Sequence, residues 1–301
     1  MILICENVSK SIQKKDILKN IQFKLRENEI VGLVGPNGAG KTTLMKLMVG
    51  LSSSSTGSIR LNDFDIKKNF LDFISQVGAI IEVPIFYPSM TGFQCLSYYG
   101  KLRNINKNKI LQAVKLVGLE NNIQSKVRTY SLGMRQRLGI AQAIMNQPQL
   151  LILDEPFNGL DPQGVDELKD ILLTTKNAGS TVFISSHTLS ELEIICDRII
   201  FMNHGEIIKD DYLHSQTRCG LKMCLITSDN LTAKNLIEKN NPTIRLKRNN
   251  QQLILEHLVV SQFTDILILL KNHNIEIISM EEAKESLQKT FHSIITKESE
   301  K

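Results

Sequence analysis

A glycine-rich run ends in one lysine and two threonines, a combination suited to binding phosphate. Its residues are Gly35, Pro36, Asn37, Gly38, Ala39, Gly40, Lys41, Thr42 and Thr43, which match the phosphate-loop pattern GxxxxGK[ST]. Glycines let backbone N–H groups approach phosphates closely, and the start of a following helix favours anions. We expect Lys41 to meet the β- and γ-phosphates of a nucleotide and Thr42 to hold Mg²⁺. The alternative is a chance glycine-rich turn.

Two adjacent carboxylates follow a short apolar run, Leu150 to Leu153. A carboxylate at the end of a buried strand can bind the Mg²⁺ of a nucleotide, and we assign this role to Asp154. The neighbouring Glu155 is then the candidate base that polarises the attacking water. By itself the run could be a strand followed by an acidic turn, but its place after a phosphate loop favours the catalytic interpretation.

The elements that must position these residues are short apolar strands separated by helices. Strands are expected at Glu29 to Val34, Leu150 to Leu153 and Thr181 to Ser185, and helices at about Lys41 to Val49 and over much of 90–145. This alternation predicts an α/β fold whose parallel sheet is buried on both faces. Residues 1–30 alternate like strands, with a turn near Gln13 to Asp16.

The end of the chain, residues 216–301, carries no chemical motif and shows a different pattern. The expected order is strand 221–227, helix 231–239, strand 243–248, strand 251–256, helix 261–272, strand 275–279 and helix 282–297. This order suggests a small ferredoxin-like α+β domain, with Asn249 and Asn250 in the turn between its middle strands. Regulation, dimerisation and capping of the main domain all stay open as its role.

The composition is that of an ordinary globular protein, with 301 residues, 42% hydrophobic and 22% charged. It excludes disordered and collagen-like classes. The formal net charge is +5, and the Lys and Arg residues are scattered along the chain. A solvated surface explains this mild basic balance better than a nucleic-acid-binding patch does, and a weak attraction to an anionic membrane face stays open.

The cysteines and the apolar stretches indicate the cellular compartment in which the protein works. The five cysteines are Cys5, Cys95, Cys196, Cys219 and Cys224, and none form a CxxC pair. Disulfides and zinc are therefore not expected, and a reducing, cytosolic compartment fits. The apolar start, Met1 to Cys5, is too short for a signal peptide, and Leu258 to Leu270 is interrupted by polar residues. If the protein works at a membrane, another chain must supply the membrane part.

Residues 1–215 resemble the nucleotide-binding subunits of ATP-binding-cassette (ABC) transporters. Besides the two runs above, three segments occur in the family's order. Tyr130 to Arg137 looks like the signature that normally reads LSGGQ, Asn158 to Asp161 sits at the D-loop, and Ser186-His187 sits at the switch histidine. The resemblance implies a phosphate-loop NTPase fold of the ABC type with a helical subdomain at about 84–145, followed by the C-terminal domain 216–301.

The resemblance also implies a mechanism in which two copies pack head to tail across two ATP molecules. Ser131 and Gly133, at a helix start, would present a hydroxyl and a backbone N–H to the γ-phosphate held by the other copy. His187 would contact the γ-phosphate and orient the water, and Asp161 would help form the dimer contact near the opposite site. A separately encoded membrane permease is the implied partner, with the chain peripheral on the cytoplasmic side and no nucleic-acid partner.

Three positions depart from the family's usual pattern. The signature has Leu132 and Met134 where Gly and Gln are usual, and Ile12 stands where an aromatic residue stacks on adenine. An isoleucine offers apolar contact but no π face, so looser adenine binding is expected. Glu82 replaces a glutamine, and we expect its carboxylate to touch Mg²⁺ or its water and to link the site to the membrane partner. The alternative is an exposed acid beside a loop.

The run from Ile80 to Pro84, together with the signature segment, resembles transporters that export or confer resistance to peptide antibiotics, such as bacitracin and lantibiotics. The segment from Val83 to Phe93 includes Phe86 and Tyr87, and its apolar and aromatic character suits a groove that receives a permease helix. Ordinary core packing is the equal alternative for this segment.

Two other classes of protein compete with a transporter subunit. Soluble cassette ATPases act in repair, iron–sulfur assembly or translation, but only about ninety residues separate Gly40 and Ser131, too few for a long coiled coil as well as a helical subdomain. Translation versions usually carry two cassettes, and one phosphate loop occurs here. The third class is a regulatory module that senses ATP without hydrolysing it. The presence of both Glu155 and His187 argues against this class, because an inactive site often lacks one of them.

Overall fold

The structure is a computed structural model that describes residues 1–213, 221–241, 244–249, 252–258 and 260–282. The chain divides into two compact units, Met1–Tyr212 and Leu213–Lys301. No helix in the described part of the chain is long and apolar enough to cross a membrane.

The first unit is built on a six-stranded sheet of order β10-β9-β3-β8-β7-β6. The strands are β3 (Ile30–Val34), β6 (Val77–Ile80), β7 (Leu150–Leu153), β8 (Thr181–Ser186), β9 (Arg198–Asn203) and β10 (Glu206–Tyr212). The strands β3, β6, β7, β8 and β9 run parallel to one another, whereas the edge strand β10 is antiparallel to β9. Every residue of β3, β7, β8 and β9 is buried, which confirms the parallel sheet predicted from the apolar runs.

A four-stranded antiparallel sheet of order β2-β1-β4-β5 completes the core of this unit. Its strands are β1 (Leu3–Ile12), β2 (Lys15–Leu25), β4 (Thr56–Leu61) and β5 (Phe64–Asp65). Gln13 and Lys14 turn the first hairpin with φ of 48° and 66°, the left-handed region typical of tight hairpin turns. Side chains from both sheets and from α1 (Lys41–Met48) share one apolar core, in which Phe23 of β2 stacks on Phe183 of β8 at 5.5 Å.

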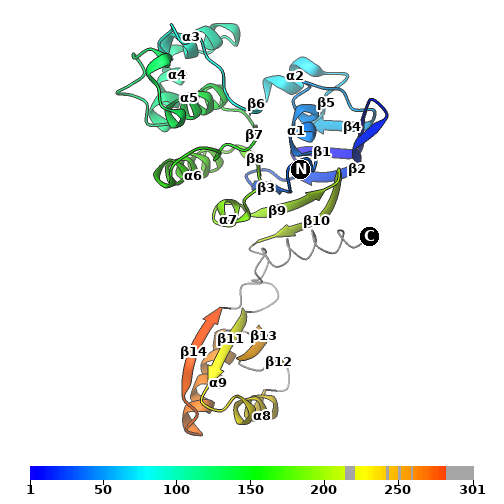
Figure 1. The fold of residues 1–301 in the computed structure, drawn as a ribbon, viewed down its shortest axis with the longest axis vertical. Helices are drawn as coiled ribbons and strands as arrows, with labels where there is room; N and C mark the ends of the chain where they lie inside the picture. The colour runs from blue at the N-terminus through cyan, green and yellow to red at the C-terminus, as the bar shows by residue number, and fades with distance from the viewer. Residues whose placement is uncertain (214–220, 242–243, 250–251, 259, 283–301) are drawn as a thin grey trace. The chain divides into compact units, whose positions relative to one another are not determined.

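Helices lie between β6 and β7 in sequence and form the predicted helical subdomain (Figure 1). They are α3 (Gly92–Leu102), α4 (Lys107–Leu116) and α5 (Leu132–Ile144), with a short 3₁₀ turn at Val127–Thr129 before the last. Each begins at a residue whose side chain accepts a backbone N–H: Thr91, Asn106 and Ser131. The remaining helices of the unit are α2 (Phe70–Ser75), α6 (Pro162–Asn177) and α7 (Leu189–Leu192).

The second unit has the order β-α-β-β-α-β among its described residues. Its elements are β11 (Leu221–Thr227), α8 (Asn230–Asn240), β12 (Arg245–Asn249), β13 (Gln252–Leu258), α9 (Val260–Asn272) and β14 (Ile277–Glu282). The sheet order β12-β13-β11-β14 is wholly antiparallel, which is the arrangement of a split β-α-β unit. The helix expected over 282–297 lies outside the described residues.

The last strand begins two residues later than the sequence pattern predicted. Asn274 has a φ of 54°, and the N–H of Ile275 donates to the carbonyl of Leu270 at 3.0 Å. These contacts close the end of α9 in the manner of a helix C-terminus. Ile275 is buried in the core at the end of α9. The sequence pattern counted this apolar residue as the start of the strand, whereas its burial comes from packing at the helix end.

Candidate functional site

The glycine-rich loop connects β3 to α1 and therefore lies at the carboxyl end of the parallel sheet. Gly38 and Gly40 have φ of 84° and 105°, values that side-chain-bearing residues rarely adopt. At Gly35 the constraint is space, because a Cβ would lie 2.3 Å from the carbonyl oxygen of Met202. The backbone can take this tight path only with glycine at these three positions.

Lys41, the first residue of α1, folds its side chain back over the loop. Its ammonium donates to the carbonyl of Gly35 at 2.7 Å and lies 3.2 Å from Glu155 Oε1, with the lysine side chain only 6% exposed. Thr42 and Thr43 follow in the first turn of the same helix. The cation is therefore held at the loop, where anionic phosphates would be bound by the glycine backbone.

The two predicted carboxylates follow β7 and are held by a serine from the next strand. Asp154 is buried, and its Oδ1 accepts from the hydroxyl of Ser185 at 2.7 Å. The same hydroxyl oxygen accepts the backbone N–H of Glu155 at 2.8 Å. Ser185 thereby fixes the ends of β7 and β8 against each other and orients both acids.

Glu155 is the centre of a three-residue cluster. Its Oε1 faces the ammonium of Lys41, while its Oε2 lies 2.8 Å from Nδ1 of His187 and accepts the backbone N–H of His187 at 3.2 Å. The Glu155 backbone has a left-handed φ of 48°, an arrangement that recurs where function imposes local strain. Three residues predicted from separate motifs are thus brought together around one carboxylate that can accept a proton.

The signature segment belongs to a second group of residues at the start of α5. Ser131 caps this helix, and its hydroxyl oxygen accepts the N–H of Met134 at 3.2 Å. Tyr130 is buried, which raises the pKa of its hydroxyl, and that hydroxyl donates to the carbonyl of Asn122 at 2.8 Å. The hydrogen bonds of Ser131 stay within its own helix start, so this group is distinct from the Lys41 cluster.

Glu82 lies two residues beyond β6, on backbone with a φ of 64°. Its carboxylate forms an ion pair with the ammonium of Lys46 at 2.6 Å, and 63% of its side chain is exposed. Lys46 stands one turn after Thr42 on α1, so Glu82 contacts the helix that the phosphate loop opens. Lys46 was not predicted as part of the site, because no motif links positions so far apart in sequence.

Comparison with known proteins places the chain among transporter ATPases. The profile of the family described as ABC transporter matches residues 18–158. The bacitracin transport ATP-binding protein of Enterococcus faecalis is 43% identical over 72% of this chain and 72% of its own length. The bacitracin transport ATP-binding protein of Bacillus licheniformis is 31% identical over 98% of this chain and 97% of its own length. The lantibiotic transport ATP-binding protein of Streptococcus pyogenes is 41% identical over 69% of this chain and 89% of its own length.

The chain belongs to the ABC transporter family. Among solved structures, the ATP-binding subunit of an ABC transporter is 26% identical, with a TM-score of 0.66 over 72% of this chain and 92% of that one. A dimeric cassette in a post-hydrolysis state shares the fold at 21% identity and a TM-score of 0.64, over 71% of this chain and 99% of that one. The protein is accordingly an ATP-binding subunit and an ATPase with the α/β cassette fold that the sequence predicted.

Two further predicted residues of this ABC cassette lie at turns. Ile12 ends β1 opposite Lys15, at the tip of the first hairpin, and 48% of it is exposed. Asp161 caps α6, where its Oδ1 accepts the N–H of Gly164 at 3.0 Å. Asp161 thus shapes the start of α6, while Ile12 offers an accessible apolar side chain.

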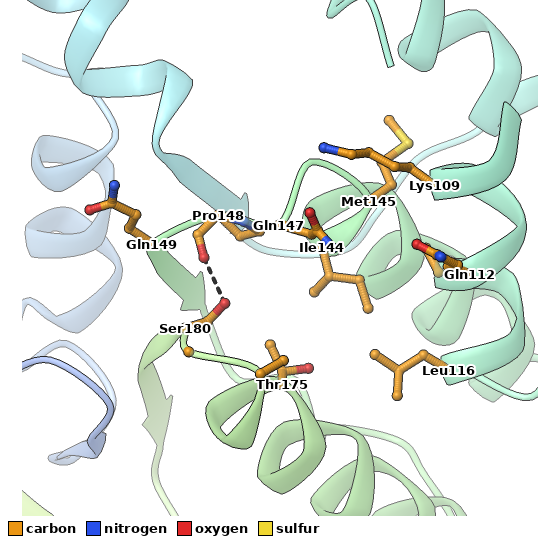
Figure 2. Close-up of a pocket in the computed structure, with 13 residues that line it drawn as sticks. Lys109, Gln112, Leu116, Ile144, Met145, Gln147, Pro148, Gln149, Thr175 and Ser180 are labelled. Atoms are coloured by element: carbon orange, nitrogen blue, oxygen red, sulfur yellow. Dashed lines mark hydrogen bonds between the residues drawn. The ribbon is translucent and has the colours of Figure 1, made fainter. Parts of the chain in front are cut away.

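A separate cavity of about 210 Å³ lies between α4, the end of α5 and the end of α6. Figure 2 shows Leu116, Ile144 and Thr175 converging on it from these three helices. Ser180 and Pro148, joined by a 2.6 Å hydrogen bond, place it at the amino ends of β7 and β8. Ligands of open parallel sheets bind at the carboxyl ends, so this cavity is not the phosphate site of the cassette.

Ser185 is another functional residue that the sequence interpretation missed, besides Lys46. The signal was a hydroxyl near the end of the apolar run Thr181 to Ser186, where the side chains are otherwise mostly large and apolar. Its partner could not be read from the sequence, since the bond to Asp154 joins residues from different strands. The structure also pairs the hydroxyl of Ser186 with Glu191 at 2.7 Å, which fixes the backbone just before His187.

Proposed function

We propose that this subunit powers the export of, or immunity to, a peptide antibiotic, as a head-to-tail homodimer bound to a separately encoded permease on the cytoplasmic side of the membrane. The observation that carries the catalytic part is the cluster of Lys41, Glu155 and His187 at the carboxyl end of the sheet. The peptide-antibiotic part is supported by relatives named for bacitracin and lantibiotic transport, one of which aligns along nearly the whole chain.

The residues beside the phosphate loop fit a bound Mg²⁺. Asp154 offers a buried carboxylate, and Thr42 offers a hydroxyl from the first turn of α1. Both are hard oxygen donors, which this ion prefers. When bound, the ion neutralises the charge that develops on the phosphate oxygens. We assign Thr42 and Asp154 as its protein ligands, with Glu82 acting on the ion or its water.

The ion pair between Lys41 and Glu155 suggests how phosphate binding prepares the base. Lys41 faces the oxygen of Glu155 that His187 leaves free. Anionic β- and γ-phosphates compete for the lysine ammonium, and its departure frees Glu155 Oε1 to accept a proton from water. His187 keeps its contact with Glu155 Oε2, so the carboxylate holds its orientation when Lys41 leaves Oε1.

The second group of residues would complete the site of the other copy. The hydroxyl of Ser131 accepts a bond from Met134, which leaves its own proton free to donate to a phosphate oxygen. Gly133 lies in the first turn of α5, where backbone N–H groups point toward an approaching anion. With Asp161 at the start of α6, these residues support an ATP bound between the two copies.

The apolar segment after Glu82 supports docking of a permease helix, with one revision. Phe86 is buried and packs edge-on against Tyr99 at 6.5 Å, so it is a core residue. The neighbours Val83, Ile85 and Tyr87 are 63%, 86% and 63% exposed. Their exposed fractions place these three on the accessible side, and we assign them, in place of Phe86, to the permease contact.

Ile85→Asp is expected to reduce co-purification of the permease about tenfold or more, because it buries a charge in an apolar contact. ATP affinity should stay at the wild-type value, since Ile85 is 86% exposed. The matched comparison is Phe86→Ala, which should instead lower the free energy of unfolding by about 3–5 kcal/mol. Quantitative pull-down and ATP titration check Ile85→Asp, and urea denaturation checks Phe86→Ala. An Ile85→Asp variant that binds the permease normally would refute the assigned surface.

Glu82→Gln is expected to lower the rate of ATP hydrolysis about tenfold and to raise the Mg²⁺ concentration needed for half-maximal rate, because an amide binds a hard cation more weakly. Titrating Mg²⁺ at saturating ATP measures both quantities. The control is Lys46→Gln, which removes the ion pair and keeps the carboxylate, so its turnover should match wild type. Equal turnover in wild type and Glu82→Gln would reduce Glu82 to an exposed acid.

A further inference from the structure

The signature segment and the loop after β7 pack against each other through two leucine–glycine pairs. Leu132 lies on Gly159, and Leu160 lies on Gly133. If Gly159 carried a Cβ, that atom would lie 2.6 Å from Cδ2 of Leu132. The corresponding position on Gly133 lies 3.5 Å from Cδ2 of Leu160. Each segment thus contributes one leucine that rests on the glycine of the other, and we call these four residues the interlock.

The interlock explains an unusual residue of the signature. Leu132 stands where the family usually has glycine, and it keeps a large apolar side chain 38% exposed at the surface. Its close approach requires Gly159, whose φ of 75° also favours glycine. Next to the interlock, an ion pair of 3.0 Å joins Arg137 of α5 to Glu167 of α6.

The loop side of the interlock is connected through the backbone to Glu155. Gly159 follows Glu155 by four residues, and the N–H of Asn158 donates to the carbonyl of Glu155 at 3.2 Å. The signature side begins at Ser131, the cap of α5. A displacement of the helix start would therefore act through Leu132 on a short, hydrogen-bonded turn that begins at Glu155.

We propose that Leu132 is a positioning residue which couples the signature of each subunit to the Glu155 of that same subunit. The inference rests on the proposed function, in which Ser131 and Gly133 engage the ATP of the other copy. Engagement of that ATP moves the helix start, and the interlock moves the turn after β7 with it. Each nucleotide site thereby reports its occupancy to the carboxylate of the other site.

A role in coupling differs measurably from a role in packing. Leu132 is 38% exposed, so truncating it should cost less stability than truncating a fully buried leucine, and the shift in Tm is measured beside kcat. If the interlock transmits movement to Glu155, the same truncation should lower kcat while KM for ATP changes little. A merely structural contact would lower Tm and the amount of active protein without this split.

The test compares Leu132→Ala, Leu132→Met, Gly159→Ala and the double variant Leu132→Ala with Gly159→Ala in the full chain with Mg-ATP. We expect each alanine variant to lower kcat about tenfold, with Leu132→Met restoring most of it because its long apolar side chain still reaches Gly159. The double variant should be no slower than either single one, since Gly159→Ala acts by displacing the Leu132 side chain, which the double variant lacks. Gly179→Ala controls for backbone strain, as its φ is 104° and a Cβ there meets nothing within 4 Å.

ATP-driven dimerisation in a Glu155→Gln background separates this inference from the proposed function. We expect Glu155→Gln alone and together with Leu132→Ala to form the dimer at similar ATP concentrations. An unchanged kcat in Leu132→Ala, or additive losses in the double variant, would overturn the interlock while the dimer stands. If Glu155→Gln forms no ATP-driven dimer at all, the head-to-tail function falls, and the interlock falls with it.

Discussion

Glu155→Gln is expected to lower ATP turnover by a factor of about one hundred or more, the range typical for loss of a general base. The amide keeps the shape of the side chain and a hydrogen-bonding oxygen beside His187, but it cannot accept a proton from water. ATP should still bind, because Lys41 and the glycine loop are unchanged. Bound ATP that is not hydrolysed should trap the dimer, which size-exclusion chromatography with Mg-ATP would detect.

A nearby acid provides the matched control for this substitution. Glu193 stands beside α7, a few residues beyond His187, and contributes nothing to the cluster around Glu155. Glu193→Gln should hydrolyse ATP at the wild-type rate and form no trapped dimer. Substantial turnover in Glu155→Gln would assign the base to another residue and would leave the pairing of Glu155 with His187 as a structural contact.

Lys41→Ala is expected to weaken ATP binding about one-hundredfold, equivalent to about 2.7 kcal/mol. The variant removes the cation that meets the phosphates, and it leaves Glu155, 18% exposed, without the ammonium that lies 3.2 Å away. Calorimetric titration with Mg-ATP measures the change in Kd. Hydrolysis and ATP-driven dimerisation should both be lost at ATP concentrations that saturate the wild type.

Lys46 supplies the control for Lys41 on the same helix. It lies one turn further along α1, and its ion pair with Glu82 is partly exposed to solvent. Lys46→Ala should therefore bind ATP within a few-fold of wild type, as expected for the loss of an exposed ion pair. Equal losses in Lys41→Ala and Lys46→Ala would indicate a general electrostatic effect and not a specific phosphate contact.

The parts of the site that lie within one continuous segment could be predicted from the sequence. Gly35 to Thr43 is one continuous segment that forms the loop after β3 and the first turn of α1, so its spacing alone specifies the local geometry. Likewise, Asp154 and Glu155 directly follow an apolar strand, and parallel strands place their carboxyl ends at one edge. Motif and periodicity were sufficient there because the required contacts are local.

The contacts that join distant segments could not be read in the same way. Ser185 with Asp154 and Lys46 with Glu82 pair residues 31 and 36 positions apart, and no sequence period connects them. Burial also depends on neighbours: docking and core packing stayed equal alternatives for the segment with Phe86, and in the structure its ring packs inward on Tyr99 while Ile85 is exposed. Composition identifies an apolar segment, but only tertiary packing decides which of its side chains are covered.

Purification of the tagged chain from detergent-solubilised membranes, after co-expression with membrane proteins from its own gene neighbourhood, tests the transporter assignment most directly. We predict that a polytopic membrane protein co-purifies in the presence of Mg-ATP, that the complex hydrolyses ATP, and that Ile85→Asp loses the membrane protein while retaining hydrolysis. Recovery of an active ATPase that brings down only ribosomes or nucleic acid would contradict the account and indicate a soluble cassette ATPase instead.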